Sequence, residues 1–96
     1  MAKGYIIGHL NVKDMAAFGT GYAMKVPAII SEFGGAFLVR GGDVRYREGG
    51  EADIDVIVEF PDVASAEALL ASDAYKEIEA VRKEQTTGLF MLVEGV

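Results

Sequence analysis

Cysteine is absent from this sequence of 96 residues, and histidine occurs only once. The lack of cysteine excludes disulfides and thiolate metal sites, and a single histidine is too few for a histidine-rich metal site. Long apolar runs are missing as well, since none approaches the ~20 residues that a membrane-spanning helix needs. We therefore expect no metal, no cofactor and no membrane partner.

Positive charge is scarce too: 9 Lys and Arg residues stand against 15 Asp and Glu residues, which leaves a net charge of −6. An acidic chain is a poor candidate for binding the phosphate backbone of a nucleic acid. The apolar run in residues 1–12 is shorter than the apolar region of a signal peptide, and no small-residue cleavage site follows it. These residues therefore predict a first strand and not a signal peptide. We expect a cytoplasmic protein without a nucleic-acid partner.

Hydrophobic residues make up 51% of the chain, which predicts one folded domain over residues 1–96. Alternation and β-branched or aromatic residues predict strands over 4–12, 36–40, 54–60 and 89–93, with 44–47 as a resumption of the second strand. Helical spacing of apolar residues predicts helices over 15–33, over 63–71 and over a further segment that begins after Ser72. Pro27 predicts a break of the first helix near residues 25–26.

Local signals set the predicted helix ends. Asp14, Asp62 and Ser72 precede helical segments and are typical N-cap residues. Gly34 and Gly35 end the first helix, one of them in the left-handed position that follows a helix. On the last helix, we expect Arg82 and Lys83 to lie on a mixed-charge outer face and to pair with Glu79.

The element order is β-α-β-β-α-β, which predicts an α+β fold: a ferredoxin-like four-stranded antiparallel sheet with two helices on one face. Helices then leave the other face of the sheet, here called the bare face, uncovered. Continuous apolar runs at 37–39 and 90–93 are typical of strands that are buried on both sides. We therefore expect a homodimer that stacks two bare faces. A loosely covered monomer, or a tail folding back, is the alternative.

Charged residues interrupt the predicted sheet. Alternation places His9, Asp55 and Glu59 on the bare face, and Arg40 could join them there. A charge enclosed by a dimer needs a partner, so Arg40 has three interpretations. It forms a structural ion pair, it holds a carboxylate or carbonyl of a substrate, or it ends a strand in water.

A small set of residues is the candidate site. Histidine is the side chain type that exchanges a proton near neutral pH, so a catalytic role would fall to His9 first, and a hydrogen-bonded structural role is the alternative. Arg40 and Glu59 are candidate substrate-binding residues. Tyr22 and Phe37 are candidates for the apolar wall of a pocket, with a place in the core as the alternative for Tyr22. No metal-ligand set is found.

Five motifs over nearly the whole chain resemble the family called domain of unknown function 1330. The motifs are Val26-Pro27-Ala28 with Phe33-Gly34-Gly35, Phe37-Leu38-Val39-Arg40-Gly41-Gly42, Val58-Glu59-Phe60-Pro61, the helical Ser65-Ala66-Glu67-Ala68 with Ser72-Asp73-Ala74-Tyr75, and the end Val93-Glu94-Gly95-Val96. The chain departs from the family at Leu69-Leu70, where an aromatic pair is usual. If those aromatics line a pocket in relatives, the pocket here has a different shape.

The resemblance implies a dimeric α/β barrel made of two ferredoxin-like subunits. It also implies a superfamily that includes cofactor-free monooxygenases, lactone isomerases and haem enzymes, while the family itself carries no established activity. Fold does not imply function. Our first hypothesis is a small dimeric protein that binds or transforms a carbonyl-bearing or aromatic metabolite. The alternative is a non-catalytic dimer module without a substrate. Haem binding is disfavoured because His9 is the sole imidazole.

Overall fold

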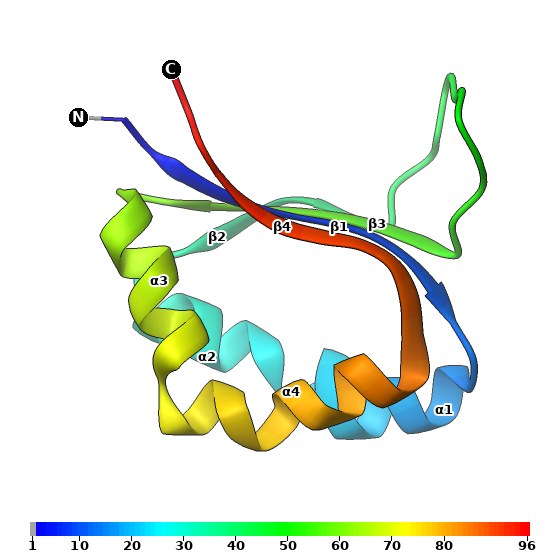
Figure 1. Cartoon of the computed structure of the whole chain (residues 1–96), viewed down its shortest axis with the longest axis horizontal. Coiled ribbons are helices and arrows are strands. Elements are labelled where there is room, and N and C mark those ends of the chain that lie inside the picture. The colour runs from blue at the N-terminus through cyan, green and yellow to red at the C-terminus, as the bar shows by residue number, and fades with distance from the viewer. Residues whose placement is uncertain (1) are drawn as a thin grey trace.

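The computed structural model of the chain describes residues 2–96. It holds one antiparallel sheet in the order β2-β3-β1-β4, built from β1 (Gly4–Val12), β2 (Ala36–Arg40), β3 (Ile54–Phe60) and β4 (Thr86–Glu94). All helices lie on one side of this sheet (Figure 1). The ferredoxin-like α+β fold that the element order predicts is therefore confirmed.

The helical layer has five segments: α1 (Met15–Phe18), the π-helix η1 (Gly19–Ala23), α2 (Val26–Glu32), α3 (Val63–Ala71) and α4 (Asp73–Gln85). The predicted N-caps are confirmed, because the side chains of Asp14, Asp62 and Ser72 each accept a hydrogen bond from a backbone N–H of the following turn. Within residues 2–96, no helix combines the length and the apolar character needed to cross a membrane.

The first helical region is interrupted as Pro27 predicts. Pro27 lies in the first turn of α2, where its missing N–H costs no helical hydrogen bond. Before it, η1 packs closely on α4: a Cβ on Gly21 would lie 2.8 Å from Cγ1 of Val81. Gly34, with φ of 79°, takes the left-handed position that ends α2. The break therefore turns η1 and α2 into separate pieces that both cover the sheet.

Two predicted boundaries are wrong. Residues 44–47 form no strand, and the whole segment 41–53 is a loop without helix or strand. This loop stands on the side of the sheet away from the helices (Figure 1). In addition, β4 begins at Thr86 and not at Leu89. Both errors concern pairing with distant strands, which local residue patterns do not report.

The core lies between the helices and the sheet. Phe60, Leu69 and Tyr75 are its most completely buried large side chains. Each such burial stabilises the fold by about 1.5–3 kcal/mol. The bare face differs, because Leu38, Leu89, Met91 and Val93 remain exposed in the single chain.

Candidate functional site

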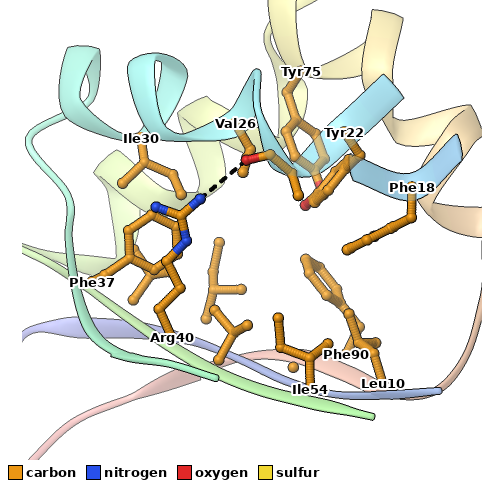
Figure 2. A pocket seen from close by; sticks show the side chains of 15 residues that line it. Leu10, Phe18, Tyr22, Val26, Ile30, Phe37, Arg40, Ile54, Tyr75 and Phe90 are labelled. Atoms are coloured by element: carbon orange, nitrogen blue, oxygen red, sulfur yellow. Dashed lines mark hydrogen bonds between the residues drawn. The ribbon is translucent and has the colours of Figure 1, made fainter. Parts of the chain in front are cut away.

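A cavity of about 60 Å³ lies between the helical layer and the sheet (Figure 2). Its helical side is formed by Phe18, Tyr22, Ala23, Val26, Ile30 and Tyr75. Its other side is formed by apolar residues from all strands, together with Arg40. One water needs about 10–15 Å³ of such space, so the cavity has room for several waters or for part of a small organic molecule.

A bulge in β2 decides the direction of Arg40. Between Phe37 and Val39, the register of β2 against β3 shifts by one residue. Beyond the shift, Arg40 lies opposite Val56, which faces the cavity. A regular strand would direct Phe37 and Arg40 to opposite faces, whereas the bulge brings both to the helix side. The predicted place of Arg40 on the bare face is therefore wrong.

The Arg40 side chain lies across the open edge of the cavity. It is exposed, and its Nη2 donates a hydrogen bond to the carbonyl oxygen of Ala23 at 3.3 Å, drawn as a dashed line in Figure 2. Its Cζ lies 4.8 Å from the centre of the Phe37 ring. Within residues 2–96, Arg40 forms no ion pair with a carboxylate. Most of its five N–H donors therefore have no partner among the described residues.

Tyr22 lies on the helical wall of the cavity. Its ring stacks on Phe18 with centres 5.4 Å apart, and its hydroxyl lies 2.8 Å from the hydroxyl of Tyr75. Burial is the main cause that raises the pKa of Tyr22 far above its ordinary value of 10.0. The phenol therefore stays protonated at neutral pH. Figure 2 shows the hydroxyl ends of both tyrosines next to each other at this wall.

Arg82 supports the tyrosine pair, and its predicted place on the outer face of the last helix is wrong. The side chain is buried, its Nε donates to the Tyr75 hydroxyl oxygen at 3.1 Å, and its Cζ lies 3.8 Å above the Phe90 ring. Glu79 pairs with Lys83, as predicted, and with Lys76, but not with Arg82. A sequence signal was available: Arg82 follows Tyr75 by seven residues, and that spacing returns to the same helix face.

The bare face carries a separate cluster. His9 and Asp55 are direct cross-strand neighbours, and Nδ1 of His9 donates to Oδ1 of Asp55 at 2.7 Å. From the loop, Nη2 of Arg47 donates to Oδ2 of the same carboxylate at 2.6 Å. These hydrogen bonds, first from Arg47 and then from His9, lower the pKa of Asp55. Sequence reasoning missed Arg47, because nothing local shows that the loop folds back onto the sheet.

Glu59 lies on the bare face as well. It accepts hydrogen bonds from the Tyr5 hydroxyl at 3.0 Å and from Nζ of Lys3 at 3.2 Å. The bond from Lys3, followed by that from Tyr5, lowers the pKa of Glu59. This carboxylate is therefore ionised and already satisfied by its neighbours.

The structure divides the predicted site residues into two groups. Arg40, Tyr22 and Phe37 line the cavity, whereas His9 and Glu59 lie on the opposite face of the sheet. The predicted gathering of His9 with Arg40 is therefore wrong. Among residues 2–96, the polar side chains on the cavity wall are Arg40, Tyr22 and Tyr75 alone, and no group of three or more His, Cys, Asp or Glu side chains is placed to hold a metal ion. The wall offers hydrogen-bond donors and no carboxylate.

A comparison with protein families matches residues 3–96 to the family described as "Domain of unknown function (DUF1330)". A comparison with curated proteins finds no significant match. The residues that carried the resemblance thus lie within a match that covers nearly the whole chain.

Solved structures share the fold at low sequence identity. A protein of unknown function from Rhodopseudomonas palustris superposes with a TM-score of 0.74 at 14% identity, over 99% of this chain and 83% of that chain. SnoaB, a cofactor-independent oxygenase from Streptomyces nogalater, gives 0.66 at 16% identity, over 97% and 92%. An ethd family protein from Bacillus halodurans gives 0.55 at 17% identity, over 100% of both chains. These similarities show the fold alone.

Proposed function

The chain belongs to the family described as a domain of unknown function (DUF1330), and we propose that it binds a small, mainly apolar molecule with a carbonyl or anionic oxygen in the cavity between helices and sheet. The observation that carries the proposal is the composition of the cavity wall. Apolar side chains surround a few hydrogen-bond donors, which is the usual make-up of a small-molecule site.

The volume of the cavity limits the size of the ligand. About 150 Å³ of apolar cavity holds benzene, which is more than the 60 Å³ found here. An aromatic ring therefore cannot lie wholly inside the cavity, and part of a ring-sized ligand must extend outward past Arg40. Because Arg40 is exposed and has free donors, a carboxylate on that outer part would meet a guanidinium. The proposed ligand thus has an apolar ring, an inner oxygen and an outer anionic group.

A probe with this design is 4-acetylbenzoate, and acetophenone is the same molecule without the carboxylate. Both are titrated into the protein while the backbone amide signals of cavity residues are followed by NMR. We expect both probes to shift these signals, with 4-acetylbenzoate binding about threefold to tenfold more tightly through a partly exposed charge pair. If neither probe shifts cavity signals at millimolar concentration, the binding proposal is wrong.

Arg40→Gln tests the outer anchor. The variant should lose the preference for 4-acetylbenzoate and keep the affinity for acetophenone. Arg45→Gln is the matched control, because Arg45 is exposed in the loop 41–53 and does not line the cavity. An equal preference in Arg40→Gln and in the control would remove Arg40 from the site.

The homodimer stays part of the proposal, with two copies packing their bare faces together. Its support is the set of exposed apolar side chains on that face, such as Leu89, Met91 and Val93. The mutual pairing of His9, Asp55 and Arg47 favours the second candidate function, a dimer module in which these residues set the register of the interface. We assign His9 and Glu59 to the bare face, as residues of this interface. The cytoplasmic location of the protein stays a prediction.

Native mass spectrometry of freshly purified protein, followed by denaturing analysis of released molecules, compares the two candidates directly. A dimer that carries a small organic molecule supports the binding function and identifies the class of ligand. A dimer that carries no small molecule and binds neither 4-acetylbenzoate nor acetophenone supports the dimer module. A monomer contradicts the proposed packing of bare faces.

A further inference from the structure

A directed chain of hydrogen bonds runs from α4 to the cavity. Arg82 can only donate, and its Nε gives a hydrogen bond to the hydroxyl oxygen of Tyr75 at 3.1 Å. The Tyr75 hydroxyl then lies 2.8 Å from that of Tyr22. Arg82 is 9% exposed, and within residues 2–96 it forms no ion pair. Among the residues that the structure describes, Tyr75 supplies the side-chain oxygen to which Arg82 donates.

The direction of the second hydrogen bond follows from the first. Each phenol has one proton, and the oxygen of Tyr75 already accepts from a cation. Its proton is repelled by the guanidinium and so points away from Arg82, toward the oxygen of Tyr22. Tyr22 then accepts from Tyr75, and its own proton has no partner on this side. Because Tyr22 lines the cavity (Figure 2), that proton can be donated to a ligand in the cavity.

We propose that the Tyr22 hydroxyl is the inner hydrogen-bond donor of the cavity, that Tyr75 and Arg82 are positioning residues which orient it, and that the ligand class is therefore aryl or cyclic ketones and related phenols. This inference rests on the proposed binding function and names the group that receives the inner oxygen. The series of hydrogen bonds from Arg82 through Tyr75 also polarises the Tyr22 hydroxyl, because hydrogen bonds in series strengthen one another. An oxygen that gains negative charge is favoured at this position over a neutral apolar group of the same shape.

The test compares acetophenone with α-methylstyrene, which has the same shape but carries a methylene group in place of the carbonyl oxygen. We expect the wild-type protein to bind acetophenone about threefold to tenfold more tightly, as one buried hydrogen bond allows. Difference infrared spectroscopy of bound acetophenone should show its carbonyl stretch shifted to lower frequency. Tyr22→Phe should abolish the preference and the shift while keeping the affinity for α-methylstyrene.

Variants of Tyr75 and Arg82 test whether these residues orient the Tyr22 hydroxyl or only support the fold. Tyr75→Phe and Arg82→Met should each reduce the carbonyl shift and the preference, and Tyr75→Phe serves alone if Arg82→Met does not fold. Tyr46→Phe is the matched control, because Tyr46 is exposed in the loop and does not line the cavity. It should behave as the wild type.

The outcomes are distinguishable. If both probes bind the wild type equally and the carbonyl stretch does not move, the role of Tyr22 is overturned while the binding function stands. If Tyr22→Phe loses both probes to the same extent, the hydroxyl is structural and the inference is overturned as well. If neither probe binds the wild type, the binding function is wrong and the inference falls with it.

Discussion

The two faces of the sheet differ in whether their polar side chains have partners within the protein. On the bare face, the carboxylates of Asp55 and Glu59 each accept two side-chain hydrogen bonds from neighbours. On the helix face, Arg40 and Tyr22 form no hydrogen bond with a carboxylate of residues 2–96. A face whose charges satisfy one another suits a fixed interface, whereas donors around an apolar space suit a ligand that brings the acceptor.

The core beneath the helices and the bare face also differ in packing. A Leu→Ala substitution in each region tests this difference, and it should give the largest change in the free energy of unfolding among our predictions. Leu69→Ala, at a site that is 1% exposed, should lower the free energy of unfolding by about 3 kcal/mol. Leu89→Ala, at a site that is 47% exposed, should cost less than about 1 kcal/mol. Urea unfolding at low protein concentration measures both. Similar losses would show that the bare face is as well packed as the core.

A pair of glycines sharpens the contrast within the helical layer. Gly21→Ala forces a Cβ to within 2.8 Å of Val81 and should destabilise the protein by about 1–3 kcal/mol. At Gly19 a Cβ meets nothing within 4 Å, so Gly19→Ala should be neutral or stabilise by up to about 1 kcal/mol. Thermal unfolding separates the two. A neutral Gly21→Ala would contradict the close packing of η1 on α4.

The bare face can be broken as an interface without touching the cavity. Met91→Lys places an ammonium group where two bare faces would meet, so the dissociation constant of the dimer should rise at least tenfold, or about 1.4 kcal/mol. Met24→Lys is the control, because Met24 is exposed between η1 and α2. Sedimentation equilibrium gives both constants. A dimer that is unaffected by Met91→Lys must use another surface.

The smallest expected effect concerns pH. Hydrogen bonds from Arg47 and His9 lower the pKa of Asp55 below its ordinary value of 3.8. A carboxyl group of this kind contributes stability in full above its unfolded pKa and loses that contribution as the pH falls through its lower folded pKa. The wild type should therefore lose more stability than Asp55→Asn as the pH is lowered below about 4.

Acid titration of urea midpoints measures this difference, and Asp43→Asn, in the exposed loop, is the control. The control should follow the wild type. Parallel pH profiles for wild type and Asp55→Asn would show that the cluster on the bare face adds nothing to folding.

Much of the fold follows from local signals along the chain. Asp14, Asp62 and Ser72 were predicted as caps and act as caps, because an N-cap needs only its own side chain and the next turn of backbone. Alternation also placed His9, Asp55 and Glu59 correctly on one face, since the period of a strand is a property of its backbone.

Arg40 and Arg82 show what the sequence by itself left open. Strand alternation within residues 36–40 could not settle the face of Arg40, because the bulge exists only in the pairing of β2 with β3. The charge of Arg82 suggested a solvated face, whereas contacts with Tyr75 and Phe90 bury it. The sequence alone determined the element order, the helix caps and the faces of the regular strands, which depend on neighbours along the chain. The tertiary structure alone decided strand register, the course of the loop 41–53 and the donors of the cavity, because these depend on hydrogen bonds and packing between segments far apart in sequence.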